Sequence, residues 1–325
     1  MHRGLKLAEE AQEADLTAGP CLVHLVREVN GLRPLREFAA ALREHPPGID
    51  HELVLAMKGF TSTGSARPYL KEVEDLAPRV VFFPDRGLDL GVYFATADLL
   101  RRERYCFVNS NGRPLVTGWL AKMDAALQPP GVGQVGATGS WASQRSWLMY
   151  SMGLPSAYRG LMPSPQVARR QMLGMELERH KIEQRSLADR VRTRARTLAG
   201  VPEGLLGVER FPAHHIRPNA FMIKHSALTG LELFVVRNKT DTSSLEVGRR
   251  SITRQLQEMG LTSLVVDSAG AAYEPDRWDR SCTLYQGDQQ GLLVADNQTH
   301  FYAHGDEERR SVLSTIAWGP RANPS

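Results

Sequence analysis

Short apolar runs that alternate with amphipathic segments constrain this chain more than any other feature of its sequence. The first runs are residues 21–26 (CLVHLV), 52–57 (ELVLAM), 80–83 (VVFF) and 105–108 (YCFV). Each run has the length and composition of a buried strand, and the segments between them carry apolar residues at helical spacing. This alternation predicts an α/β fold with an open, mostly parallel sheet flanked by helices on both faces.

The same pattern resumes further along the chain. We expect strands at residues 131–135, 220–223, 231–236 and 264–266, and helices at 248–259 and 307–317. The organisation that follows is a polar leader over residues 1–19 and a single domain over 20–325. Within that domain a first half (20–145) and a second half (205–325) are separated by a helical insertion around 164–200.

Composition narrows the functional classes. The chain has 325 residues, 42% apolar and 23% charged, as in an ordinary soluble globular protein. No apolar run has the roughly 18 residues of a membrane-spanning helix. Three widely spaced cysteines argue against a disulfide framework or a zinc site and fit a reducing cytoplasm. The net charge of +4 does not by itself indicate a nucleic-acid partner.

The insertion at 164–200 is dense in arginine, lysine and helix-forming residues. Charge runs are usually solvated helix faces, and that is one interpretation. The other is a peripheral contact with anionic lipid headgroups, which would place a cytoplasmic protein at the inner face of a membrane.

Polar residues follow two of the predicted strands. The turn after residue 83 contains Asp85, Gly87, Asp89 and Gly91, and residues 109–112 (NSNG) follow the next strand. Open α/β sheets bind ligands beyond the carboxyl ends of their strands, and glycines let backbone amides approach a phosphate closely. The alternative is that the Asn-Gly pair only forms a turn and the glycines only serve packing.

In the order of its motifs the chain resembles glycosyltransferases of the GT-A type, most nearly the inverting family 2 group, over about residues 20–275. The matching elements are the polar turn 27–30 after the first strand, the turn 85–91, the stretch 217–225 and the segment 245–252 followed by Gly260. The elements 135–140 (VGATGS) and 287–298 are similar to those of bacterial surface-polysaccharide glycosyltransferases.

The resemblance implies a nucleotide-sugar donor. By this match the donor-binding residues are Val26, Arg27, Lys58, Asp85, Asp89, Asn109, Asn111 and Arg217. Two positions depart from the family pattern. Lys58 stands where a carboxylate normally contacts the nucleoside, and Asn109-Ser110-Asn111 replaces the metal-binding Asp-x-Asp element. Since asparagine binds Mg²⁺ or Mn²⁺ weakly without a carboxylate neighbour, we expect no metal site here, with Mn²⁺ or Mg²⁺ held elsewhere as the alternative.

The resemblance also implies a general base. In inverting members a carboxylate takes the proton of the acceptor hydroxyl, and the match assigns that role to Glu246. Asp288 and Asp296, each in a polar loop, are rival candidates. A structural alternative for Glu246 is that it only favours the amino terminus of the helix expected at 248–259.

These expectations converge on a transferase that moves a sugar to a surface-polysaccharide acceptor, free or lipid-linked, by direct displacement. The alternative is a catalytically silent subunit of a polysaccharide assembly complex that binds nucleotide sugars or acts as a scaffold.

Overall fold

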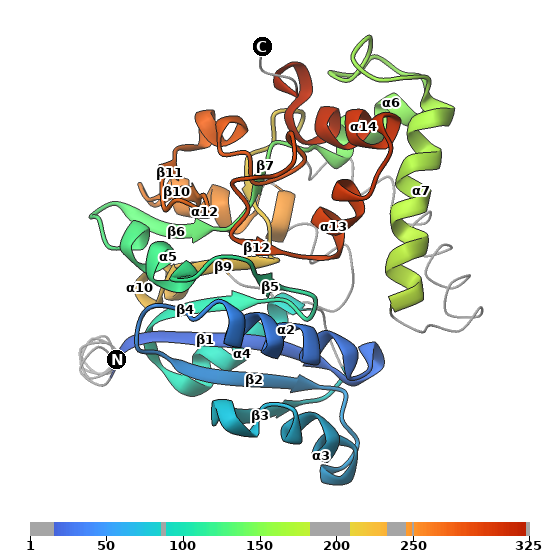
Figure 1. The fold of residues 1–325 in the computed structure, drawn as a ribbon. Helices are drawn as coiled ribbons and strands as arrows, with labels where there is room; N and C mark the ends of the chain where they lie inside the picture. The colour runs from blue at the N-terminus through green and yellow to red at the C-terminus, as the bar shows by residue number, and fades with distance from the viewer. Residues whose placement is uncertain (1–15, 86–88, 183–208, 233–244, 249, 323–325) are drawn as a thin grey trace, which may run out of the picture.

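The computed structural model describes residues 16–85, 89–182, 209–232, 245–248 and 250–322. An eight-stranded sheet with the order β11-β10-β6-β9-β4-β1-β2-β3 forms its centre (Figure 1). The strands are β1 (Thr17–Arg27), β2 (Glu52–Lys58), β3 (Arg79–Phe83), β4 (Arg102–Val108), β6 (Val132–Gly136), β9 (Ala220–Lys224), β10 (Thr262–Val266) and β11 (Ala272–Tyr273).

Most neighbouring strands of this sheet are parallel. β1 pairs in parallel with both β2 and β4, β2 with β3, and β6 with β10. β9 is antiparallel to its neighbours β4 and β6, and β11 is an antiparallel edge strand. The predicted fold class, an α/β protein with a mostly parallel open sheet between helices, is therefore confirmed.

Alternating side chains of β1 enter two different cores, because successive residues of a strand point to opposite faces of the sheet. Cys21, Val23 and Leu25 pack on one face with α4 (Asp89–Leu100), α10 (His225–Thr229) and α12 (Ile252–Glu258). Leu22 and Val26 pack on the other face with α2 (Arg33–Glu44), α3 (Thr63–Lys71) and α5 (Trp119–Leu127).

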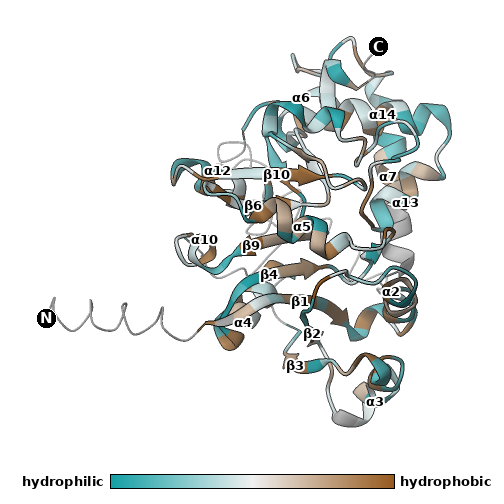
Figure 2. Cartoon of the chain, turned by 60° about the vertical axis from the view of Figure 1, so that its left-hand side comes forward, coloured by the Kyte–Doolittle hydropathy of each residue, from teal (hydrophilic) through white to brown (hydrophobic). Residues whose placement is uncertain are grey.

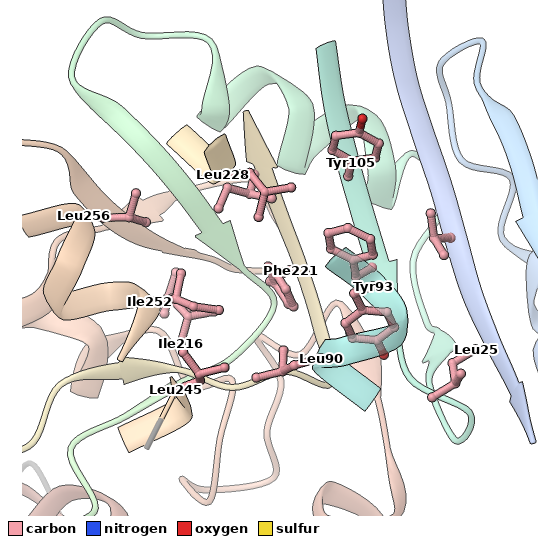
Figure 3. Close-up of a cluster of buried hydrophobic side chains, with 14 of the residues drawn as sticks. Leu25, Leu90, Tyr93, Tyr105, Ile216, Phe221, Leu228, Leu245, Ile252 and Leu256 are labelled. Atoms are coloured by element: carbon pink, nitrogen blue, oxygen red, sulfur yellow. The ribbon is translucent and has the colours of Figure 1, made fainter. Parts of the chain in front are cut away.

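Both cores are continuous across the sheet. Figure 3 shows part of the first one, in which Tyr105, Phe221 and Ile252 from three different elements converge. Figure 2 shows the same distribution by colour, with hydrophobic brown on the strands and hydrophilic teal on outer helices. The sheet is thus buried on both faces, and its strand ends are where polar groups gather.

Four helices form a separate group beside the sheet (Figure 1). Two come from the middle of the sequence and two from near its end. They are α6 (Gln144–Ser151), α7 (Pro165–Ile182), α13 (Asn297–Ala303) and α14 (Glu307–Trp318). Buried side chains such as Tyr150, Tyr158 and Val312 pack between them. Among the described residues no helix is long and apolar enough to span a membrane.

Two element boundaries differ from the sequence prediction, and two expected segments lie mainly outside the described residues. β1 begins at Thr17 and so extends into the segment expected to be a polar leader, whose residues 1–15 lie outside the described part. The helix expected from residue 248 begins at Ile252, because Ser251 caps it by accepting a hydrogen bond from the Arg254 amide. The strand expected at 231–236 and most of the basic part of the insertion lie outside the described residues.

Candidate active site

A cavity of about 350 Å³ opens beyond the carboxyl ends of β1 and β4. Two walls of different chemistry face each other across it. The first, here called the strand-end wall, consists of Arg27, Asn30, Asp89, Asn109 and Asn111.

The second wall, here called the helix wall, comes from the helical group. It consists of Trp147 on α6, Met172 and Met175 on α7, and Leu313 and Ile316 on α14. These five side chains are apolar, although Gln144 of α6 and Gln298 of α13 also line the cavity. A ligand that fills the cavity therefore meets both polar groups and a hydrophobic surface.

Hydrogen bonds fix the strand-end wall. The Asn30 side-chain amide donates to Ser110 Oγ at 2.8 Å, which ties the turn after β1 to the turn after β4. Asn109 Oδ1 accepts the backbone N–H of Asn111 at 3.1 Å, and the Asn109 N–H donates to the carbonyl of Asn219 at 2.9 Å. The wall is therefore held in place by contacts that come from three separate segments of the chain.

Two buried side-chain amide atoms of the cavity have no hydrogen-bond partner among the described residues. They are Asn30 Oδ1 and Asn219 Nδ2, in side chains that are 7% and 1% exposed. Buried polar atoms are nearly always hydrogen-bonded, and leaving one unsatisfied costs about 1–3 kcal/mol. One acceptor and one donor at the cavity are therefore available to a polar ligand.

Arg217 and Asp296 form a buried ion pair at the base of the cavity. The short strands position them: β8 (His215–Ile216) pairs with β7 (Gly139–Ser140), and β12 (Val294–Ala295) pairs with β5 (Arg113–Pro114). Arg217 Nη2 donates to Asp296 Oδ2 and to Gln298 Oε1, both at 2.8 Å. Burial opposes the charge on the guanidinium, but the carboxylates of Asp296 and Glu246 outweigh it and raise the pKa of Arg217.

Both oxygens of Asp296 are already engaged. Oδ2 accepts from Arg217, while Oδ1 accepts the backbone N–H groups of Gln298 and Thr299 as the cap of α13. A carboxylate with this many donors stabilises a helix and an arginine, and its lone pairs are poorly placed to remove a proton from a substrate.

Glu246 lines the same cavity from the helical residues 245–247 that precede α12. Its charge and that of Asp89 both act on the buried phenol of Tyr93, whose pKa is raised well above its ordinary value mainly by burial. Because Ser251 caps α12, Glu246 does not stand in the first turn of that helix.

The structure brings Arg27, Asp89, Asn109, Asn111, Arg217, Glu246 and Asp296 to the one cavity. Four other predicted site residues lie outside its lining. Val26 alternates with Arg27 along β1 and points into the hydrophobic core. Asp288 is 88% exposed and pairs with Arg310 at 3.0 Å.

Lys58 and Asp85 also lie outside the cavity lining. Lys58 Nζ is buried, 3.7 Å from Asp85 Oδ1, while the Asp85 side chain is 62% exposed. Burial and the nearby charge of Arg27 lower the pKa of Lys58, and the carboxylates of Asp89 and Asp85 oppose that shift. Lys58 therefore pairs with Asp85 and does not line the cavity.

Several lining residues had no signal in the sequence that would assign them to a site. The whole helix wall belongs to this class, because its apolar residues read as ordinary core positions. His215 lines the cavity as well, and burial lowers its pKa to about 4, so it is neutral near pH 7. Its Nδ1 lies 2.7 Å from the carbonyl of Ala213.

The Asn109–Asn111 corner does not fit the divalent metal that the GT-A resemblance implies. Its side chains offer neutral amide oxygens, and Asn109 Oδ1 already accepts a backbone hydrogen bond. Mg²⁺ and Mn²⁺ prefer carboxylate oxygens. Among the described residues no group of three or more His, Cys, Asp or Glu side chains is arranged to hold a metal ion.

Comparisons with known proteins give weak similarities. No protein-family model matches the sequence, and no curated protein matches it significantly. The fold is similar to that of a mannosyltransferase from Pyrobaculum calidifontis in complex with GDP-Man and Mn²⁺, at 12% identity and a TM-score of 0.42, over 97% of this chain and 81% of that one.

Two further structures show similarity at the same level. Mouse xyloside xylosyltransferase 1 matches at 9% identity and a TM-score of 0.40, over 77% of this chain and 86% of that one. A putative glucose-1-phosphate thymidylyltransferase from Bacillus anthracis matches at 8% identity and a TM-score of 0.41, over 94% of this chain and 99% of that one. Two of these three proteins are glycosyltransferases by name, the class that the sequence resembles. At these scores the likeness says nothing about activity, which has to be inferred from the site.

Proposed function

We propose that the protein is a glycosyltransferase that moves a sugar from a nucleotide-sugar donor to a glycan acceptor. The observation that supports it best is the single cavity beyond β1 and β4, which gathers Asp89, the Asn109–Asn111 corner and Glu246. Ligand sites of open α/β sheets lie at this edge of the sheet. The motif order of the sequence points to the same class.

The donor would lie against the strand-end wall. Arg27 and Arg217 would offset the negative charge of a diphosphate. The Asn109–Asn111 corner does not fit a metal ion that could do so. The unsatisfied amide atoms of Asn30 and Asn219 would hydrogen-bond the ribose or the sugar. Asp89, in the first turn of α4, would accept hydrogen bonds from sugar hydroxyls.

Transfer would proceed by direct displacement. The acceptor oxygen attacks the anomeric carbon, and the bond between this carbon and the diphosphate oxygen breaks. The proton of the acceptor hydroxyl passes to a carboxylate. Glu246 is the better base, because both oxygens of Asp296 already accept hydrogen bonds and Asp288 lies outside the cavity. Positive charge from the buried Arg217 would stabilise the leaving diphosphate. Inversion at the anomeric carbon follows from the family resemblance.

For the acceptor we propose a glycan of a surface polysaccharide that carries an apolar group, as a lipid-linked intermediate does. The helix wall supports this choice, since a free sugar would leave Trp147, Met172 and Met175 facing water or polar hydroxyls. A cytoplasmic enzyme that uses such an acceptor would work at the inner face of the membrane.

A thermal-shift screen against a panel of nucleotide sugars tests the proposal, because a ligand that binds only the folded state raises the melting temperature. We expect one donor to stabilise the protein and to be hydrolysed slowly in the absence of acceptor. Stabilisation without any turnover would favour the catalytically silent subunit instead. If no nucleotide sugar binds, the cavity is not a donor site.

A further inference from the structure

The connection between α6 and α7 exposes a concentration of large apolar side chains. Eight such side chains are exposed among the described residues, and four of them fall between residues 152 and 173. These four side chains are 40–51% exposed and are here called the apolar tip: Met152, Leu154 and Leu161 lie in the connection, and Leu173 lies on α7. Figure 1 shows this connection at the edge of the molecule, beside the end of the chain. Grouped exposed apolar residues mark interaction surfaces more often than scattered ones do.

The same stretch is purely cationic. Residues 141–175 contain four arginines, Arg145, Arg159, Arg169 and Arg170, and no lysine, histidine, aspartate or glutamate. Arg159, Arg169 and Arg170 are exposed, and none of the four forms an ion pair with a carboxylate of the described residues. An apolar surface rimmed by arginine complements an anionic phospholipid surface, in which acyl chains lie beneath phosphate groups.

Buried tyrosines hold the connection in this exposed position. Tyr158 is fully buried, donates to the carbonyl of Ile316 at 3.0 Å and accepts the Ser143 N–H at 3.1 Å. Tyr150 donates to the carbonyl of Pro163, and Ser156 Oγ donates to the carbonyl of Ser146 at 2.6 Å. The connection that carries most of the apolar tip is therefore anchored to the helical group by these hydrogen bonds.

We propose that the apolar tip and its arginines form a docking surface for an anionic lipid bilayer. The inner sides of α6 and α7 carry Trp147, Met172 and Met175 of the helix wall, so docking here would place the cavity next to the bilayer. The inference deepens the proposed function and rests on it only for the identity of the acceptor. Lipid binding itself depends on the tip alone.

Co-sedimentation of the full chain with sucrose-loaded vesicles tests the proposal. We expect binding to vesicles of phosphatidylcholine and phosphatidylglycerol (1:1), much weaker binding to phosphatidylcholine alone, and a decrease with added salt. The double variant Leu154→Asp/Leu161→Asp should lower the affinity by about tenfold or more. The matched control is Leu99→Asp/Met259→Asp, which adds the same charge at side chains that are 58% and 42% exposed on other elements.

Equal loss of binding in both double variants, or none in the tip variant, would overturn the proposal. So would self-association of the protein that the tip variant abolishes, because the tip would then be a contact between copies of this chain. Size-exclusion chromatography of each variant reports this outcome. The nucleotide-sugar thermal shift should be the same in all variants, so that a failure of donor binding and a failure of lipid docking are distinguishable.

Discussion

The strand-end wall and the helix wall of the cavity differ both in chemistry and in the way the chain builds them. The strand-end wall is polar and is formed by residues at or just after the ends of β1 and β4, together with Asp89, the first residue of α4. The helix wall is apolar and comes from helices that lie far apart in the sequence. Such a cavity matches a ligand pair with one polar and one amphipathic member. Under the proposed function, the polar wall would bind the donor and the helices would select the second substrate.

The largest expected effect concerns the residue that faces the strand-end wall. We expect Glu246→Gln to lower kcat by about 10²–10⁴-fold, the usual contribution of a general base, with donor binding retained. Turnover of the cognate donor and acceptor measures the effect, and the donor thermal shift checks the fold. Asp288→Asn is the matched control, since that carboxylate is exposed and paired with Arg310. Full turnover in Glu246→Gln would remove this residue from the mechanism.

The ion pair beneath the two walls should matter for stability. Arg217→Met leaves Asp296 buried without its charged partner, which costs about 3–5 kcal/mol of the free energy of unfolding. Urea denaturation measures this cost. The double variant Arg217→Met/Asp296→Asn should recover part of it, because it removes the uncompensated charge and keeps an oxygen to cap α13. A loss below about 1 kcal/mol in the single variant would show that the pair is hydrated.

A pH effect should arise under the strand-end wall, in β1. His24 is buried and stacks on Phe38 with ring centroids 3.7 Å apart, and neither ring nitrogen has a hydrogen-bond partner in the part of the chain that the structure describes. Burial lowers its pKa from 6.5 to about 3. Between these values the unfolded chain binds a proton that the folded protein does not, so stability falls as the pH drops from about 6.5 to about 3.

We expect His24→Leu to flatten this dependence, with a difference of a few kcal/mol in the free energy of unfolding at the acid end of the window. Urea denaturation at pH 7 and pH 4.5 measures it. His304→Leu is a suitable control, because that ring is exposed at the end of α13. The same slope in His24→Leu and in the parent protein would contradict the assignment.

The helix wall gives a smaller effect that tests the difference between the walls. We expect Trp147→Ala to raise the KM for an acceptor with an apolar group by about tenfold, with the donor KM unchanged, because only hydrophobic contact area is lost. Steady-state kinetics with varied acceptor and with varied donor separates the two. An equal rise in both KM values would mean that the helix wall contacts the donor as well.

The two walls also differ in how far the sequence could predict them. The alternation of apolar runs predicts the parallel strands, and polar residues at strand ends predict Asp89, Asn109 and Asn111 as neighbours, while Arg27 follows from the family resemblance. Local pattern is enough there, because the carboxyl ends of parallel strands meet at one edge. Side-chain direction within a strand was not predicted, and so Val26 was expected at the site although it points into the core.

The helix wall lay beyond prediction for a physical reason. Trp147 and Ile316 are brought together by packing of helices that are distant in the sequence, and an apolar residue at helical spacing has the same pattern in a core as in a cavity. The pairing of Asp296 with Arg217 is likewise a long-range contact. Through this contact Asp296, a candidate base in the sequence prediction, caps a helix and pairs with Arg217.

The smallest expected effect is that of metal removal on the rate. It distinguishes a diphosphate stabilised by a metal ion from one stabilised by arginine at the strand-end wall. Because the Asn109–Asn111 corner supplies neutral oxygens and Arg27 and Arg217 supply positive charge, EDTA should leave the rate unchanged, and added Mn²⁺ should not raise it. Turnover of purified protein, dialysed against EDTA and then assayed with and without Mn²⁺, measures this. A loss of activity that Mn²⁺ restores would mean that Asp89 or Glu246 helps to hold a cation. In that case a metal ion would supply the positive charge at the strand-end wall, and the arginines would contribute only to donor binding.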